Sequence, residues 1–295
     1  MENKTPDFII IGAAKSGTTT LYEYLCRHPQ IYMSTPKEPD FFSIDTNYNR
    51  GMEWYYSLFE QAKPTQICGE ASTTYSRLHQ HPETVERIYQ TLPHVKLIYI
   101  MRHPVDRAYS FYIHRFKGAL HKPEHAVSNT FETTIKQQSE FIESSYYLEQ
   151  IERYLQFFPR KSFLFLLMKD LIEKPNDTLK EILSFIGADT NINLMEEKIV
   201  ANKASDYPEW YVKKQLLNPL KSFPGVNFVS SLLPDSAKNS MYQIIKKAKY
   251  KEWKDSIDTP PPMLSETRTM LIEHFQDRNS KLEQFLNRDL SHWNK

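Results

Sequence analysis

The stretch Phe8-Ile9-Ile10-Ile11-Gly12-Ala13-Ala14-Lys15-Ser16-Gly17-Thr18-Thr19-Thr20-Leu21 decides the fold of this chain. Its first four residues are apolar and mostly β-branched, which predicts a buried strand. Small residues then form a turn, and a loop rich in hydroxyl groups leads into a helical pattern. Such a loop aims free backbone N–H groups and the positive end of the helix at one point. The stretch therefore predicts a phosphate cradle, whose residues are Lys15, Ser16, Gly17, Thr18, Thr19 and Thr20.

The order of residues in this loop differs from that of nucleotide triphosphatases. Their phosphate loop ends in Gly-Lys-Ser/Thr, so that the lysine reaches the β- and γ-phosphates and the hydroxyl binds magnesium. Here Lys15 precedes Gly17 and lies at the tip of the turn. A nucleotide kinase also needs a magnesium-binding acid at a strand end, and the sequence offers none. A nucleotide kinase-like enzyme remains an alternative, and binding experiments can test it.

A second apolar run, Lys96–Met101, predicts another buried strand and is followed at once by Arg102-His103-Pro104-Val105-Asp106-Arg107-Ala108-Tyr109-Ser110. Pro104 suits the first turn of a helix. Ser110 falls two helical turns beyond Arg102, so both side chains can approach one group at the carboxyl end of the strand. A guanidinium fork with a hydroxyl is a good receptor for a phosphate monoester.

Together the two segments resemble the phosphate-binding motifs of sulfotransferases that use 3′-phosphoadenylyl sulfate (PAPS). Lys15-Ser16-Gly17-Thr18-Thr19 resembles their 5′-phosphosulfate loop, and residues 102–110 resemble their 3′-phosphate motif, Arg-x-Pro-x-x-Arg-x-x-Ser. The resemblance covers roughly residues 5–293 and points to the bacterial and heparan-sulfate-sulfotransferase-like branch. It implies that Arg102 and Ser110 bind the 3′-phosphate, and that Lys203 lies in a loop that closes over the donor.

The resemblance also suggests the base that removes the proton of the acceptor. Glu38, just before a Phe-Phe pair, matches the glutamate base of heparan-type relatives. Glu70, at a predicted strand end, is a second candidate. Ala71 stands where heparan-type enzymes carry a catalytic lysine, which weakens the expectation of a heparin-like substrate. His79 and His81 lie nearby in the sequence. As candidate bases we rank them below these two carboxylates.

Strands and helices alternate along the chain, which predicts a single α/β domain, residues 1–295, with a mainly parallel sheet flanked by helices and a P-loop-like phosphosulfate-binding loop. The expected strands are Phe8–Ile11, Gln66–Gly69, Lys96–Met101 and Ser162–Leu167. The expected helices are Thr18–His28, Pro82–Leu92, Val105–Phe116, Ser145–Phe157, Thr178–Ile186 and Leu264–Leu286. We interpret residues 196–262 as a lid and surface helix over the donor.

Composition limits the partners of the chain. The net charge is only +1, so nothing argues for nucleic acid. No apolar run is long enough to span a membrane. Two cysteines, Cys26 and Cys68, are too few for a disulfide framework and are expected to be reduced, buried thiols. The polar N-terminus is unlike a signal peptide, and we expect a cytoplasmic protein.

The sequence therefore predicts an enzyme that moves a sulfuryl group from PAPS to a hydroxyl or amine, without a metal, and releases adenosine 3′,5′-bisphosphate (PAP). Lys15 and Glu38 are the expected catalytic residues. A small metabolite, sugar or glycolipid is the expected acceptor, bound among the aromatic segments 54–56, 109–112 and 146–147. A non-catalytic module that binds adenosine bisphosphate remains open, as does the oligomeric state.

Overall fold

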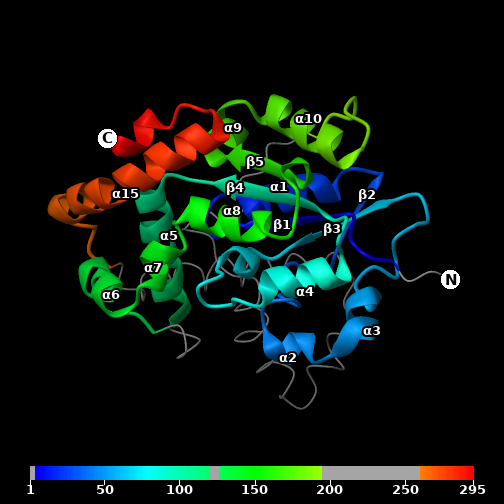
Figure 1. The fold of residues 1–295 in the computed structure, drawn as a ribbon, viewed down its shortest axis with the longest axis horizontal. Coiled ribbons are helices and arrows are strands. Elements are labelled where there is room, and N and C mark those ends of the chain that lie inside the picture. The colour runs from blue at the N-terminus through cyan, green and yellow to red at the C-terminus, as the bar shows by residue number, and fades with distance from the viewer. Residues whose placement is uncertain (1–3, 120–125, 195–259) are drawn as a thin grey trace, which may run out of the picture. The chain divides into compact units, whose positions relative to one another are not determined.

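A computed structural model of the protein describes residues 4–119, 126–194 and 260–295. Apart from Pro260, these residues belong to one compact unit. At its centre lies a five-stranded, all-parallel sheet with the strand order β2-β3-β1-β4-β5 (Figure 1). The strands are β1 (Phe8–Gly12), β2 (Ile31–Met33), β3 (Ile67–Ala71), β4 (Lys96–Met101) and β5 (Phe163–Leu167).

The central strand β1 is buried on both faces, which explains its uninterrupted apolar sequence. Ile9 and Ile11 pack into the core on one side of the sheet. Phe8 and Ile10 pack into the core on the other side. Because β1 pairs with β3 and with β4, the segments that follow these three strands meet at the carboxyl edge of the sheet. In open α/β sheets this edge is where ligands bind.

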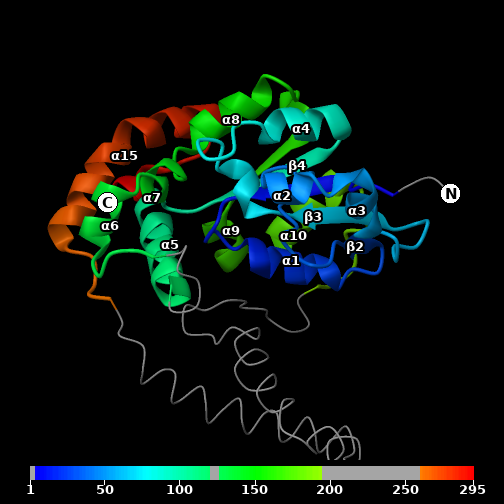
Figure 2. The same ribbon diagram turned by 90° about the horizontal axis from the view of Figure 1, so that it is seen from below.

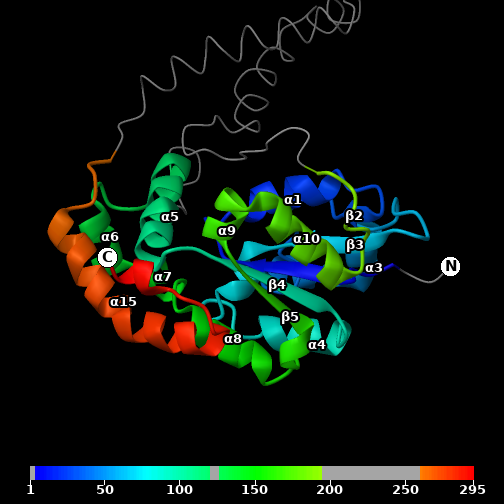
Figure 3. The same ribbon diagram turned by 90° about the horizontal axis from the view of Figure 1, so that it is seen from above.

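Helices cover both faces of the sheet, as Figures 2 and 3 show. Helices α1, α9 and α10 pack on one face, and α4, α8 and α15 pack on the other. The helices are α1 (Thr18–Cys26), α2 (Asp45–Tyr48), α3 (Gly51–Ser57), α4 (Thr84–Thr91), α5 (Pro104–Ala119), α6 (Phe131–Gln137), α7 (Glu140–Glu143), α8 (Tyr147–Leu155), α9 (Met168–Glu173), α10 (Pro175–Ile186) and α15 (Ser265–Leu286). Short 3₁₀ turns are η1 (Thr73–Ser76), η3 (Arg160–Ser162) and η5 (Ser291–Asn294).

Helix α5 joins the sheet to a third apolar cluster, formed with α6, α7 and α15. Arg107, the second arginine of the 102–110 motif, is fully buried beside this cluster. Its guanidinium donates hydrogen bonds to the Ser145 hydroxyl and to the carbonyl oxygen of Phe141. Arg107 therefore fixes the start of α5 against the segment before α8.

The predicted α/β fold with a parallel sheet is confirmed, and the four expected strands are present with their ends shifted by at most two residues. The edge strand β2 was not predicted, because three residues are too few to show a period. Helices α2, α3, α6, α7 and α9 were also missed. No helix of the described part of the chain is both long and apolar enough to cross a membrane. Most of the predicted lid, Lys203 included, lies outside the described residues, and the single-domain prediction stays a prediction.

Candidate active site

The loop between β1 and α1 has the shape of a phosphate cradle. Lys15 and Gly17 both adopt left-handed backbone conformations, with φ angles of 69° and 94°. Gly17 is the N-cap of α1 and has no side chain that could bond to the first turn. Gly12 lets the end of β1 approach η1, since a Cβ there would lie 2.1 Å from the Ser76 hydroxyl oxygen.

The environment of the Ser16 side chain indicates whether this loop can bind an anion. Its side chain is completely buried, yet its hydroxyl has no hydrogen-bond partner among the described residues. The neighbouring Tyr147 hydroxyl donates its proton elsewhere, to the carbonyl oxygen of Arg102 at 2.7 Å. A buried hydroxyl without a partner is costly, and a phosphate oxygen would satisfy it. The residues present therefore fit the 5′-phosphate that the sequence predicts.

Lys15 stands at the centre of the charged groups of the site. Burial, together with the positive charges of Arg102, Lys37 and Lys117, lowers the pKa of its ammonium group to about 8. The carboxylate of Glu38 opposes this effect. The two residues expected to be catalytic thus lie within electrostatic reach of each other, although 22 positions separate them in the sequence. An excess of positive charge around one lysine suits a donor that carries several negative charges.

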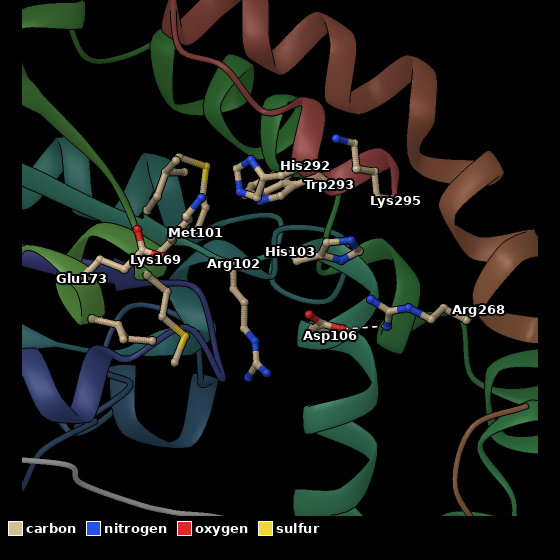
Figure 4. A pocket seen from close by; sticks show the side chains of 13 residues that line it. Met101, Arg102, His103, Asp106, Lys169, Glu173, Arg268, His292, Trp293 and Lys295 are labelled. Carbon is tan, nitrogen blue, oxygen red and sulfur yellow. Dashed lines mark hydrogen bonds and ion pairs between the residues drawn. The ribbon is translucent and has the colours of Figure 1, made fainter. Parts of the chain in front are cut away.

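Arg102 begins the second predicted phosphate site, directly after β4. Its guanidinium donates a hydrogen bond to the carbonyl oxygen of Lys15 at 3.2 Å. Figure 4 shows this side chain extending between the β1–α1 loop and α5. Ser110 lies two turns into α5, partly exposed, and its hydroxyl makes no hydrogen bond to any described residue. Arg102 is therefore close to the cradle, and the Ser110 hydroxyl remains available.

A pocket of about 400 Å³ adjoins Arg102 at the carboxyl ends of β4 and β5. Residues of α9 form one wall, and His103 and the Trp293 side chain of η5 form another (Figure 4). Asp106 and Arg268 close one side with an ion pair of 2.7 Å. Both ring nitrogens of His103 are buried without a partner among the described residues. The pocket combines apolar walls with free polar groups, as small-molecule sites do.

Glu38 lies in the loop after β2 and interacts electrostatically with Lys15. Its φ angle is 58°, and its backbone N–H donates to the carbonyl oxygen of Ala71, at the end of β3, at 2.9 Å. The carboxylate forms an ion pair with Lys37, and its side chain is 40% exposed. Glu38 is therefore fixed through its backbone while its carboxylate is open to an incoming molecule.

Glu70, the second candidate base, has no exposed surface. Its two carboxylate oxygens accept hydrogen bonds from Tyr55 at 2.5 Å and from Ser72 at 2.7 Å. Burial raises the pKa of Glu70 to about 7 despite these hydrogen bonds. A carboxylate enclosed in this way cannot meet an acceptor, which leaves Glu38 as the better placed candidate.

Asp40 is the acidic residue that the sequence reasoning missed. It has a left-handed backbone, with φ of 50°, and its carboxylate accepts a hydrogen bond from the Thr74 hydroxyl at 2.5 Å. Burial and the nearby Glu38 raise the pKa of Asp40 to about 6, although the hydrogen bond from Thr74 opposes this shift. The only sequence signal was its position two residues after Glu38. The loop conformation that brings the two carboxylates close is not visible in the sequence.

Several smaller expectations need correction. Tyr55, Tyr112 and Tyr147 belong to the core and do not line a cleft. Cys26 is exposed, whereas Cys68 is buried as expected. Within the described ranges, no group of three or more His, Cys, Asp or Glu residues is arranged to hold a metal ion.

Comparisons with known proteins agree with this geometry. A family model described as "Sulfotransferase domain" matches residues 5–276. The human bifunctional heparan sulfate N-deacetylase/N-sulfotransferase 3 is 26% identical over 304 aligned residues, which cover 97% of this chain and 30% of that protein. Human heparan sulfate glucosamine 3-O-sulfotransferase 5 is 32% identical over 196 residues, covering 64% of this chain and 55% of that protein. The chain thus spans about a third to a half of the length of these curated relatives.

Among solved structures, a sulfotransferase from Alicyclobacillus acidocaldarius is similar over almost the entire chain. The superposition covers 99% of this chain and 100% of that one, with a TM-score of 0.65 and 25% sequence identity.

Proposed function

The chain belongs to the sulfotransferase domain family and is a transferase, and we propose that it moves a sulfuryl group from PAPS to a hydroxyl or amine of a small metabolite, sugar or glycolipid. One observation carries the proposal. Lys15, the unpartnered hydroxyl of Ser16 and the guanidinium of Arg102 meet at the carboxyl edge of the sheet. This is a receptor for a molecule with two separate anionic groups.

We infer the placement of the donor from these groups. The 5′-phosphosulfate lies on the loop between β1 and α1, held by its N–H groups and by Ser16 and the threonines that follow. The 3′-phosphate lies between Arg102 and Ser110. The pocket next to Arg102 is large enough for the purine ring and offers apolar walls on α9 and η5. Lys203, outside the described residues, stays a prediction for a further contact.

In the proposed reaction the acceptor oxygen or nitrogen forms a bond to sulfur while the bond between sulfur and the bridging phosphate oxygen breaks. PAP leaves with that electron pair. Sulfuryl transfer, like phosphoryl transfer, spreads negative charge over the oxygens, so positioning and charge stabilisation supply most of the catalysis. Lys15 stabilises the leaving oxygen, and Glu38 accepts the proton of the acceptor. The electrostatic interaction between Lys15 and Glu38 is consistent with both groups acting at one site.

The acceptor class is inferred from the relatives and from the charges of the site. Of the two human relatives, one is named as an N-sulfotransferase and the other as a glucosamine 3-O-sulfotransferase. The region of Glu38 contains two carboxylates, which disfavours a strongly anionic acceptor next to the reacting group. We therefore favour a neutral or amine-bearing sugar or metabolite.

Two experiments test the proposal. Transfer of labelled sulfate from PAPS to a panel of alcohols, amines and glycosides should show turnover without added metal. Calorimetry should show tight binding of PAP and weak binding of ATP with magnesium. Tight binding of ATP with magnesium would instead favour a nucleotide kinase. Binding of PAP with no transfer to any acceptor would favour a non-catalytic module.

A further inference from the structure

We propose that Asp40 determines acceptor specificity by accepting a hydrogen bond from a second donor group of the acceptor, adjacent to the group that Glu38 deprotonates. The preferred acceptor then carries two neighbouring donors, as a vicinal diol or an amino alcohol does. This inference rests on the proposed function, because it concerns the acceptor side of the same site.

The loop that carries the two carboxylates is held in a costly conformation. Glu38 and Asp40 both have positive φ angles, 58° and 50°, which few residues other than glycine adopt. Both backbone N–H groups are bonded to the end of β3 or just beyond it. That of Glu38 donates to the carbonyl oxygen of Ala71 at 2.9 Å, and that of Asp40 donates to the Ser72 hydroxyl oxygen at 3.1 Å. Strain of this kind is typical of functional sites.

The hydrogen bonds of Asp40 are incomplete. Its Oδ1 accepts from the Thr74 hydroxyl at 2.5 Å, whereas Oδ2 has no hydrogen-bond partner among the described residues. Glu70 gives the contrast, because both of its oxygens accept hydrogen bonds from the protein. Asp40 is partly exposed, and its Oδ2 is not among the fully buried polar atoms that lack a partner. This oxygen is therefore accessible from outside the protein, and a donor group of the acceptor can bond to it.

The charges around Asp40 argue against a purely structural role. Glu38, two residues away, and Glu70, at the end of β3, are like charges that face it. Arg77, just after η1, and Lys37, on its own loop, oppose them, but no ion pair joins either of these to Asp40 among the described residues. Burial together with Glu38 raises the pKa of Asp40 to about 6. Keeping Asp40 ionised at neutral pH therefore lowers the stability of the folded protein. A hydrogen-bond donor on the acceptor would offset this effect.

The sharpest test combines a protein variant with matched acceptors. Labelled-sulfate transfer is measured for octyl β-glucoside, octyl β-glucosaminide and their monodeoxy analogues, with wild type and Asp40→Asn. Removing the reacting group abolishes transfer. Removing the neighbouring group should lower kcat/KM about 10- to 100-fold in wild type, the range for a hydrogen bond to a charged group. Asp40→Asn should lower kcat/KM for the parent compound about 5- to 10-fold, because its amide oxygen accepts a weaker hydrogen bond than a carboxylate does. With the analogue that lacks the neighbouring group, the same variant should cause less than about a threefold loss, because both changes act on one interaction.

Asp40→Asn should also change the pH dependence of kcat/KM. With the parent acceptor, wild-type kcat/KM should fall as the pH drops through about 6, where Asp40 takes up a proton. Asp40→Asn should lose this step. Asp45→Asn serves as the matched control, because Asp45 is a largely exposed carboxylate in α2, paired with Arg87. Thr74→Val leaves Asp40 charged but removes its hydrogen bond. Its kcat/KM with the parent acceptor should lie between those of wild type and Asp40→Asn.

The outcomes are distinct. An equal loss with every analogue would mean that Asp40 only supports Glu38, and an unchanged kcat/KM would mean that it has no role; either result overturns the inference. Failure of all these glycosides to be sulfated also overturns it, even when another acceptor is sulfated and the proposed function stands. PAP binding by calorimetry, expected to be equal in wild type and Asp40→Asn, shows separately whether the donor site is intact.

Discussion

The Arg102 guanidinium donates a hydrogen bond to the carbonyl oxygen of Lys15 at 3.2 Å, which joins the two predicted phosphate-binding segments directly. Arg102 is itself held through its own carbonyl oxygen, which accepts from the Tyr147 hydroxyl at 2.7 Å. Tyr147 packs against Trp293, with their ring centroids 5.9 Å apart. The two ends of the proposed donor site are therefore connected through the protein, and a change at Arg102 should affect the loop between β1 and α1.

Lys15→Ala removes the charge that stabilises the leaving oxygen. We expect kcat to fall by a factor on the order of 10² to 10³, as for other preorganised groups at a transition state. PAP affinity measured by calorimetry should fall much less, because the backbone of the loop remains. Near-normal turnover in a folded Lys15→Ala protein would show that the assignment is wrong.

The lowered pKa of Lys15 gives a pH prediction with a definite sign. The ammonium form is present below about pH 8 and is lost above it. Wild-type kcat/KM should therefore decline on the alkaline side, starting near pH 8. Lys15→Arg keeps the charge at all these pH values, so its residual activity should show no decline there. A decline that persists unchanged in Lys15→Arg would belong to another group.

Ser110→Ala is the selective test of the 3′-phosphate site. It should weaken binding of PAP and leave binding of adenosine 5′-phosphate almost unchanged, since its expected partner is the 3′-phosphate alone. Arg102→Ala should weaken PAP binding more and also disturb adenosine 5′-phosphate, because Arg102 contacts the Lys15 carbonyl oxygen. Equal losses for both ligands in Ser110→Ala would contradict this orientation of the donor.

The structure of the two segments proposed to bind phosphate was predictable because their signals are local. Each is a buried strand followed at once by a polar loop and a helix, so residues that are neighbours in the sequence are also neighbours in the fold. The parallel direction of the strands was predictable from the alternation of strands and helices. The short edge strand Ile31–Met33 has no such signal and is fixed by its pairing with β3.

The acceptor side was less predictable because its geometry is not local. Asp40 meets Thr74 and Arg77 only through the pairing of its loop with the end of β3. Arg107 belongs to the same motif as Arg102, and the sequence does not show that packing of α5 against α7 buries it completely. Burial depends on tertiary contacts that spacing alone does not determine.

Glu70→Gln tests the energetic role of the buried carboxylate. In the folded protein the pKa of Glu70 is about 7, compared with an ordinary value of 4.5. Between these two pH values the folded protein keeps a proton on Glu70 that the unfolded chain has lost. Stability should therefore fall as the pH rises from about 4.5 to 7, by about 3 kcal/mol in total. Urea unfolding at pH 5 and pH 8 should show this loss in wild type and a smaller one in Glu70→Gln. Glu53→Gln, at an exposed position in α3, should behave like wild type.

Glu38→Gln tests the base directly. The amide keeps the size of the side chain but cannot accept the proton of the acceptor, so transfer to an alkyl alcohol should fall by about 10² or more. PAP affinity should not change, because Glu38 lies on the acceptor side of Lys15. A phenol, which ionises more readily, should lose less activity than an alkyl alcohol.

The matched control for the base is Glu70→Gln, since Glu70 is the other carboxylate at this edge of the sheet and is enclosed by Tyr55 and Ser72. We expect it to retain most of its activity at pH 7. If Glu38→Gln remains fully active while Glu70→Gln loses transfer without losing its fold, the base is Glu70. That result would require the loop that carries Glu38 to open, because the acceptor cannot otherwise reach a carboxylate with no exposed surface.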